Sequence, residues 1–436
     1  MHDVLDLRDI VPDEVEQLRT SGHDVAHLEA PVRAAAAAGD IGSLDTLLDA
    51  LHAIARTAGW EYDEPGDEGA LLRMASTLEV REVSPAVLPG RIRGAWLGRA
   101  IGNTLGKPVE GWSRKEVEAY LRAAGMRPQT GYLPLLDPLP AGVPRLHPSA
   151  PVATAGRFTD VPRDDDIDWT ILNLLVLERT QGQPTTDDIL GEWLDRMPFT
   201  QTYTAERAAY RNAIRGFRPP ETATHRNPYR EWIGALIRAD VFGYVHPGDP
   251  SAAARLAMVD ARLSHVGNGL YGALWAAALV ASALAAESAE DAVRRALPAI
   301  PPRSRLAEAL RGVLALWESN ASAMQALDWI DETLGHYSWV HTINNAAVVE
   351  AALLWGDGFM EAVALAVSAG RDTDSTAATV GSVYGALHGD DAIPPHLIQS
   401  TPVRVRCAVR DFDRVTIDEL AERTLRVAQL PWSPRP

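Results

Sequence analysis

Two distant segments of the chain carry a small residue at every fourth position. These residues are Gly94, Gly98, Gly102 and Gly106 in the first segment, and Ala377, Gly381, Gly385 and Gly389 in the second. A spacing of four places them along one face of a helix. Each glycine inside a helix costs about 1 kcal/mol relative to alanine, so such a stripe needs a compensating gain. A close approach between helix backbones supplies that gain, and we therefore predict tightly crossing helices.

Apolar residues repeat at helical spacing through most of the chain from Gly90 onward. No convincing ladder of strands accompanies them. Core helices are predicted over residues 231–241, 252–263, 270–286, 303–317, 344–354 and 377–387. The sequence therefore predicts an all-α fold.

Prolines interrupt the helical pattern. Eight of them lie between residues 128 and 162 and forbid a continuous helix there. A loop this long is either a functional element or a surface insertion without a role, and the sequence leaves both readings open. A second non-helical stretch is expected over residues 217–229.

A linker is predicted near residue 85, because Pro85, Pro89 and Gly90 lie close together. It divides the chain into residues 1–85, an N-terminal helical extension of unknown role, and a main domain over residues 86–436. Helices in the extension are expected over residues 13–19, 25–38 and 41–57.

The charge balance excludes several classes of partner. Lys and Arg number 41 against 58 Asp and Glu, which gives a net charge of −17. A surface this negative repels nucleic-acid backbones and anionic lipids. The most apolar stretch, residues 273–286, is shorter than the ~20 residues that a membrane span needs. With one cysteine, Cys407, and no signal-like N-terminus, we expect a cytoplasmic protein.

Two acidic clusters precede predicted helices: residues 163–168 read RDDDID, and residues 372–375 read DTDS. One such cluster is usually structural, since Asp and Ser cap helix N-termini. Three adjacent carboxylates repel one another, however, and call for a cation. Oxygen ligands without thiolates favour Mg²⁺, Mn²⁺ or Ca²⁺. If the clusters meet in space, their five aspartates carry a formal charge of −5. Two divalent cations with a charge of +4 would nearly neutralise it, so the clusters suit a binuclear metal centre.

The ordered motifs resemble those of the ADP-ribosylglycohydrolase family over about residues 90–389. They are the glycine-rich segment 94–111, which ends in GKPVEG, the DDDID cluster, and AGRDTDS at residues 369–375. The resemblance implies a compact, orthogonal, all-α catalytic domain around two divalent cations, Mg²⁺ or Mn²⁺. It also implies hydrolysis of the anomeric bond of an α-linked ribose, with ADP-ribose on a protein side chain or another acceptor as the expected substrate.

Carried over residue by residue, the resemblance assigns the metal ligands to Asp164, Asp165, Asp166, Asp372, Asp374 and Ser375. It makes Glu110 the acid/base residue, beside Asp165 and Asp374 as catalytic metal ligands. Two positions depart from the family pattern, because Asp164 replaces a threonine and Asn103 replaces an aspartate. Weaker expectations for the substrate site are Asn103, Asp168, His265, His341 and Asn345, with Trp112, Trp232 and Trp339 as stacking surfaces.

Two alternatives remain open at this stage. The departures, the proline-rich loop and the N-terminal extension could adapt the pocket to another furanoside or a nucleoside-like metabolite. A non-catalytic, crystallin-like binding protein is the other alternative. The retained aspartates and Glu110 argue against it, because a purely structural protein gains nothing from a repulsive cluster. The expected partner is an ADP-ribosylated protein or a small ribosyl or furanosyl substrate, and neither a nucleic acid nor a membrane.

Overall fold

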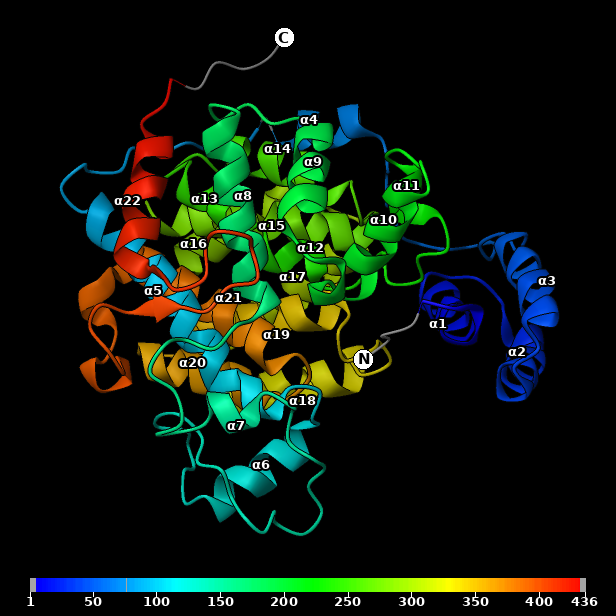
Figure 1. The fold of residues 1–436 in the computed structure, drawn as a ribbon, viewed down its shortest axis with the longest axis horizontal. Helices are drawn as coiled ribbons and strands as arrows, with labels where there is room; N and C mark the ends of the chain where they lie inside the picture. The colour runs from blue at the N-terminus through cyan, green and yellow to red at the C-terminus, as the bar shows by residue number, and fades with distance from the viewer. Residues whose placement is uncertain (1–4, 76, 432–436) are drawn as a thin grey trace.

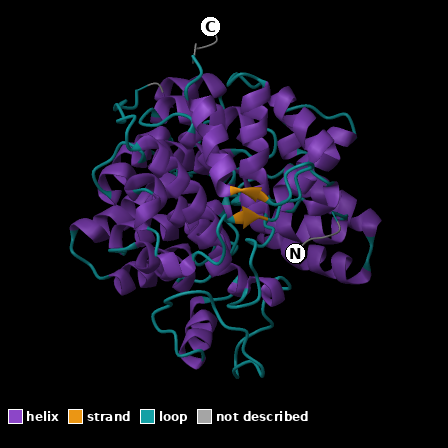
Figure 2. Cartoon of the chain, turned by 60° about the vertical axis from the view of Figure 1, so that its left-hand side comes forward, coloured by secondary structure: helices purple, strands orange, loops and turns teal. Residues whose placement is uncertain are grey.

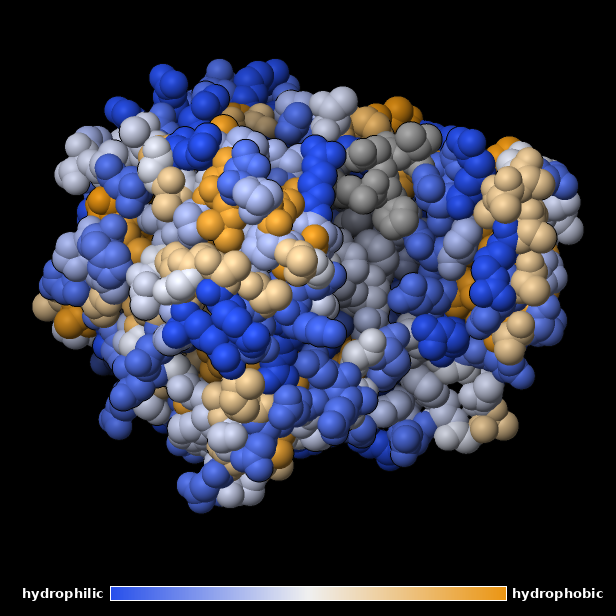
Figure 3. Space-filling view, turned by 90° about the horizontal axis from the view of Figure 1, so that it is seen from below, coloured by the Kyte–Doolittle hydropathy of each residue, from blue (hydrophilic) through white to orange (hydrophobic). Residues whose placement is uncertain are grey.

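The computed structural model describes residues 5–75 and 77–431, and helices dominate the described chain (Figure 2). The described strands are β1 (Arg404–Val405) and β2 (Val415–Thr416), which pair antiparallel. The predicted all-α class is confirmed. No helix among the described residues is long and apolar enough to cross a membrane. The face drawn in Figure 3 is mostly hydrophilic, with apolar side chains scattered in small groups.

The helices of the main body surround one central pair (Figure 1). The pair is α5 (Leu88–Gly106) and α21 (Thr373–His388). Around it lie α8 (Asp165–Arg179), α13 (Asp240–Tyr244), α14 (Pro250–Ala261), α15 (Gly267–Ala283), α19 (Thr342–Trp355), α20 (Phe359–Ser368) and α22 (Ile417–Ala428). The outer elements are α4 (Glu68–Ala75), α6 (Arg114–Ala123), α7 (Ala150–Ala153), α9 (Thr186–Arg196), α10 (Thr204–Ile214), α11 (Glu221–Thr224), α12 (Gly234–Ile237), α16 (Ala289–Ala296), α17 (Arg305–Glu318) and α18 (Ala323–Leu334). Short 3₁₀ turns lie at Lys107–Val109, Phe199–Gln201, Leu297–Ala299, Asp390–Ala392 and Pro395–Leu397.

The two glycine stripes pack against each other, so the predicted close approach is confirmed. A Cβ placed on Gly98 would lie 2.1 Å from the carbonyl oxygen of Gly381. A Cβ on Gly102 would lie 2.1 Å from the carbonyl oxygen of Ala377. Real Cβ atoms do not approach backbone this closely, and the missing side chains are what let α5 and α21 touch.

Two sequence-based boundaries were wrong. The helix predicted over residues 231–241 begins later, at Gly234, and is divided into α12 and α13. At the break, the Ile237 carbonyl accepts from Arg99 and the Arg238 carbonyl accepts from Asn173 (3.2 Å). The stretch 217–229 contains the single turn α11, which was expected to be non-helical. The remaining core helices begin and end within a few residues of their predicted bounds.

Three N-terminal helices lie at one side of the body: α1 (Leu7–Thr20), α2 (Ala26–Ala38) and α3 (Ile41–His52) (Figure 1). Their apolar residues form a cluster of their own, whereas residues from Leu71 onward belong to the main core. Buried polar contacts attach α1 to the body. Arg230 donates to both oxygens of Glu14 (2.7 and 2.8 Å), and Gln17 donates to Glu231 (2.7 Å). The domain boundary near residue 85 stays a prediction.

The Glu14–Arg230 ion pair should make stability depend on pH. Burial alone would raise the pKa of Glu14, but Arg230 and His52 lower it to about 2. A lowered pKa stabilises the fold above pH ~5, and this stabilisation is lost as the pH falls towards 2. We expect Glu14→Gln to reduce the free energy of unfolding at pH 7 by about 3 kcal/mol, and by progressively less below pH 5. Urea titrations at pH 7, 5 and 3 measure this, and Glu16→Gln on the same helix should change stability by less than about 0.5 kcal/mol.

Candidate active site

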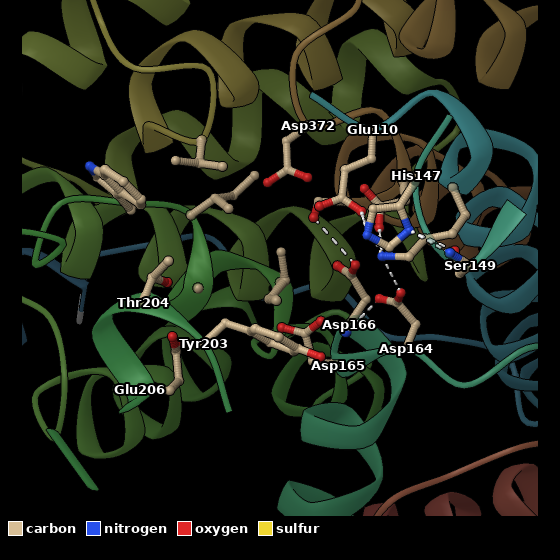
Figure 4. A pocket seen from close by; sticks show the side chains of 18 of the residues that line it. Glu110, His147, Ser149, Asp164, Asp165, Asp166, Tyr203, Thr204, Glu206 and Asp372 are labelled. Carbon is tan, nitrogen blue, oxygen red and sulfur yellow. Dashed lines mark hydrogen bonds and ion pairs between the residues drawn. The ribbon is translucent and has the colours of Figure 1, made fainter. Parts of the chain in front are cut away.

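Three helix ends converge on one cavity of about 530 Å³ (Figure 4). The C-terminal end of α5 leads through the turn Lys107–Val109 to Glu110. Asp164 caps the N-terminus of α8, where its Oδ1 accepts from the Asp166 N–H (3.1 Å). Asp372 occupies the equivalent position at the start of α21. The two acidic clusters therefore meet, at the positive ends of two helix dipoles.

The backbone fixes Glu110 beside the second cluster. The N–H of Gly111 donates to the Arg371 carbonyl (2.9 Å), and the N–H of Arg371 donates to the Trp112 carbonyl (2.7 Å). At the other cluster, fully buried Arg99 donates to the Asp166 carbonyl (2.7 Å) and to Asp240 (2.8 Å). Because Arg99 belongs to α5, the central helix pair sets the positions of both clusters.

Packing this many acids together changes their protonation. Burial raises the pKa of Asp165, Asp166 and Asp372, and neighbouring carboxylates raise it further. Burial and Asp374 raise the pKa of Glu110 to about 7, against the opposing effect of a nearby lysine. Asp164 behaves differently, because that lysine holds its pKa well below the ordinary value in spite of burial. The site therefore favours a cationic ligand.

The lysine is Lys107, which the sequence reading did not single out. Its ammonium lies 2.6 Å from Asp164, 2.7 Å from Asp374 and 2.7 Å from Glu110. Burial disfavours the charge of Lys107, but these three carboxylates raise its pKa above the ordinary value. In the sequence, the only indication that Lys107 belongs to the site was its position in the GKPVEG motif, between Gly106 and Glu110.

The carboxylates can also hold divalent cations. Two groups of three bring oxygen atoms within 4.8 Å of one another: Glu110, Asp372 and Asp374, and Asp164, Asp166 and Asp374. Asp166 Oδ1 and Asp374 Oδ1 are buried without a hydrogen-bond partner. Such orphaned oxygens are costly unless a ligand satisfies them. The donor set consists of hard oxygen atoms, which fits Mg²⁺ or Mn²⁺.

The proline-rich segment contributes to this cavity through His147 and Ser149. The N–H of His147 donates to the Pro108 carbonyl (3.1 Å), and its Nδ1 lies 2.7 Å from Ser149 Oγ. The other ring nitrogen lies 3.4 Å from Glu110. Of the two readings left open for this loop, the structure thus supports a part in the site.

The opposite wall comes from the start of α10 and the segments beside it. Tyr203, Thr204 and Glu206 lie across the cavity from His147 in Figure 4. Two arginines and two tryptophans also line the cavity: Arg163, Arg207, Trp232 and Trp339. Of the three tryptophans considered for stacking, Trp112 instead packs in the core against Tyr120, with ring centroids 5.6 Å apart.

Five residues expected to bind substrate do not belong to the cavity lining, namely Asn103, Asp168, His265, His341 and Asn345. Three of the five form hydrogen bonds with residues that line the cavity. Asn103 donates to Asp166 (3.1 Å), Asp168 accepts from Arg163 (2.6 Å), and Asn345 accepts from the backbone N–H of Asp372 (3.4 Å). His265 is fully buried beside Ser264, and His341 caps α19. Their part in substrate binding stays a prediction.

The metal ligands predicted from the sequence all reach the site. Asp164, Asp165, Asp166, Asp372, Asp374 and Ser375 line the cavity, as does Glu110. Ser375 donates to Asp166 (3.3 Å), which links the two clusters directly. The individual roles of these residues stay predictions.

Three comparisons relate this chain to known proteins. The family model described as ADP-ribosylglycohydrolase matches residues 84–434. An uncharacterized protein from Archaeoglobus fulgidus is 26% identical over 303 residues, which cover 68% of this chain and 87% of that protein. A solved structure described as an ADP-ribosylglycohydrolase-related protein complex aligns with a TM-score of 0.47 at 22% identity, covering 79% of this chain and 100% of that one.

Proposed function

The chain belongs to the ADP-ribosylglycohydrolase family, and from this premise we propose that it is a metal-dependent hydrolase that releases ADP-ribose from a modified protein side chain. The family supports glycohydrolase activity in general. The bond, the substrate and the metal are our proposal. The observation that carries it is the convergence of both acidic clusters and Glu110 on one cavity.

Mg²⁺ or Mn²⁺, when bound by the aspartates, would supply positive charge that neutralises the cluster and orients ribose hydroxyls and water. The chain's own residues do the rest. The helix N-termini of α8 and α21 fix the carboxylates before substrate arrives, so little reorganisation is needed during the reaction. The enclosed position of the cluster limits competing water.

Glu110 is the residue proposed to move the proton. Cleavage at the anomeric carbon passes through an oxocarbenium-like state and needs a proton transfer between water, the carboxyl group and the leaving group. Glu110 lines the cavity, and Lys107 and His147 contact its Oε2. These contacts hold the carboxyl group in one orientation.

The cavity is suited to a nucleotide-sized ligand. Its volume of about 530 Å³ falls within the range of small-molecule sites. Trp232 and Trp339 offer aromatic surface to a base. Arg163 and Arg207 line the same cavity and bring positive charge to it, Arg163 while it donates to Asp168, Tyr203 and the Gln201 carbonyl. These features favour ADP-ribose over a small furanoside without charge.

The test compares substrates directly. Purified protein with Mg²⁺ or Mn²⁺ is incubated with proteins mono-ADP-ribosylated on arginine or on serine, and with a small nitrophenyl furanoside. Release of ADP-ribose, measured by chromatography, supports the proposal. Turnover of the furanoside alone moves the function to another sugar substrate, and no turnover or metal binding favours a non-catalytic protein.

Glu110→Gln should remove the proton transfer while keeping the shape of the side chain. We expect kcat to fall by about 10²- to 10⁴-fold, since an amide cannot exchange this proton. Initial rates of ADP-ribose release measure the effect, and Glu118→Gln on the exposed face of α6 serves as a control. A variant within tenfold of the unmodified enzyme would contradict the role of Glu110.

A further inference from the structure

Lysine is rare in this chain, and its placement is uneven. Among 41 Lys and Arg residues, the sequence contains just two lysines, Lys107 and Lys115. Lys115 is exposed on α6. The Lys107 side chain is 10% exposed and lies in the middle of the acidic centre. A single compact ammonium therefore lies among the carboxylates of both acidic clusters.

The Lys107 ammonium bridges the two acidic clusters, as a bound metal cation would. It contacts one oxygen of Asp164 from the first cluster, one of Asp374 from the second, and one of Glu110 (2.6, 2.7 and 2.7 Å). The ammonium donates hydrogen bonds to Glu110 and Asp374 and forms an ion pair with Asp164. Asp374 is common to both groups of carboxylates that can hold a metal ion.

Positive charge is distributed unequally around these two groups. On the Asp166 side, Arg99 lies 3.7 Å from Oδ1, and Asn103 and Ser375 donate to Oδ2. On the other side, no cationic side chain of the described chain forms an ion pair with Asp372. Lys107 contacts two carboxylates of each group, but among the described residues Arg99 adds a second cation only to the first group, and Asp372 of the second group is left without an ion pair.

A metal ion in the first group would compete directly with Lys107, because both oxygens of Asp164 are already engaged, Oδ2 by Lys107 and Oδ1 by the Asp166 N–H. Mg²⁺ binds oxygen at about 2.0–2.1 Å, so an ion on Asp164 and Asp374 would lie close to an ammonium that contacts the same carboxylates. Two positive charges at such a distance repel strongly in a buried site. In the second group, Asp374 Oδ1 is without a hydrogen-bond partner and Asp372 forms no ion pair among the described residues, so these two carboxylates can bind an ion while Asp374 Oδ2 stays on Lys107.

We propose that Lys107 is a built-in cation that takes the place of one divalent ion, so that this centre binds a single metal ion through Asp372 and Asp374, beside Glu110, which keeps its proposed part in proton transfer. The inference rests on the proposed metal-dependent function and changes its stoichiometry. It differs from the sequence expectation of two divalent cations, which counted the aspartates without Lys107.

Metal counting tests the proposal without reference to activity. The full chain is stripped with chelator, titrated with Mn²⁺ in a calorimeter, and analysed for bound manganese by elemental analysis. We expect one equivalent for the unmodified chain, two for Lys107→Met and one for Lys115→Met, which removes the other lysine. If Lys107→Met fails to fold, the number of bound manganese equivalents is compared between Lys107→Gln and the unmodified chain, and we again expect two and one.

The outcomes separate this inference from the proposed function. Two equivalents in the unmodified chain would overturn the inference and leave a metal-dependent hydrolase intact. The same count in the unmodified chain and in Lys107→Met would also overturn it. No binding in any form, together with absent ADP-ribose release, would overturn the proposed function as well.

Discussion

Asp374→Asn is expected to abolish turnover and metal binding together. Asp374 is the one residue shared by both groups of carboxylates that can hold a metal ion. Its Oδ2 accepts from Lys107 (2.7 Å), and its Oδ1 is buried without a partner. An amide in this position keeps the volume but loses the charge that holds a hard cation. We expect kcat/KM to fall at least about a thousandfold, equivalent to about 4 kcal/mol of transition-state stabilisation.

Rates of ADP-ribose release and calorimetric Mn²⁺ titration measure the two effects in the same preparation. Asp391→Asn, at an exposed position just beyond α21, should leave both unchanged. Circular dichroism and thermal unfolding in chelator show whether the variant is folded. A folded Asp374→Asn variant that keeps full activity would remove Asp374 from the catalytic centre.

Metal should also stabilise the chain before any reaction occurs. A ligand that binds only the folded state raises the free energy of unfolding by RT ln(1 + [L]/Kd). The melting temperature of the unmodified chain is therefore expected to rise with Mg²⁺ or Mn²⁺, whereas that of Asp374→Asn should not. This comparison connects the loss of activity to the loss of the ion.

Much of the fold was predictable because helices leave a local pattern. The residues of α15 and α21 are apolar or small over several turns, and this pattern needs no knowledge of the rest of the chain. The break between α12 and α13 was not predictable in this way. There the side chains of Arg99 and Asn173, from distant segments of the chain, donate to the carbonyls of Ile237 and Arg238.

The same difference between local patterns and long-range contacts explains which site residues could be predicted from the sequence. The aspartates stood out because they cluster next to one another at helix starts, and the sequence shows both properties directly. Lys107 did not stand out, since a lysine in isolation is usually solvated. Its role depends on Asp164 and Asp374, which the fold brings to it from distant segments. His147 was missed because a proline-rich loop has no periodicity from which a direction could be predicted.

Gly98→Ala is expected to cause the largest loss of stability of any change proposed here. The added Cβ would lie 2.1 Å from the Gly381 carbonyl oxygen and 2.7 Å from its carbonyl carbon. These are backbone atoms, which cannot rotate away as a side chain can, so α5 and α21 must separate. Overpacking usually costs about 1–3 kcal/mol, and we expect about 4 kcal/mol or more, because the clash is between two helix backbones at the centre of the fold.

Separation of these helices should also change the geometry of the candidate active site. The C-terminal end of α5 leads to Lys107 and Glu110, and the first turn of α21 carries Asp374. A shift between the helices therefore moves the acid/base residue relative to the carboxylates. We expect activity of the folded fraction to fall at least tenfold, since a misplacement of about 1 Å can cost a factor of a hundred.

Gly191→Ala provides the matched control. Gly191 lies within α9, and a Cβ there meets nothing within 4 Å. The same substitution should therefore stabilise the chain by about 0.5–1 kcal/mol, the ordinary advantage of alanine over glycine in a helix. Urea unfolding of both variants gives the comparison. If Gly98→Ala unfolds within about 1 kcal/mol of the unmodified chain, the two stripes do not make the backbone contact that positions the catalytic centre.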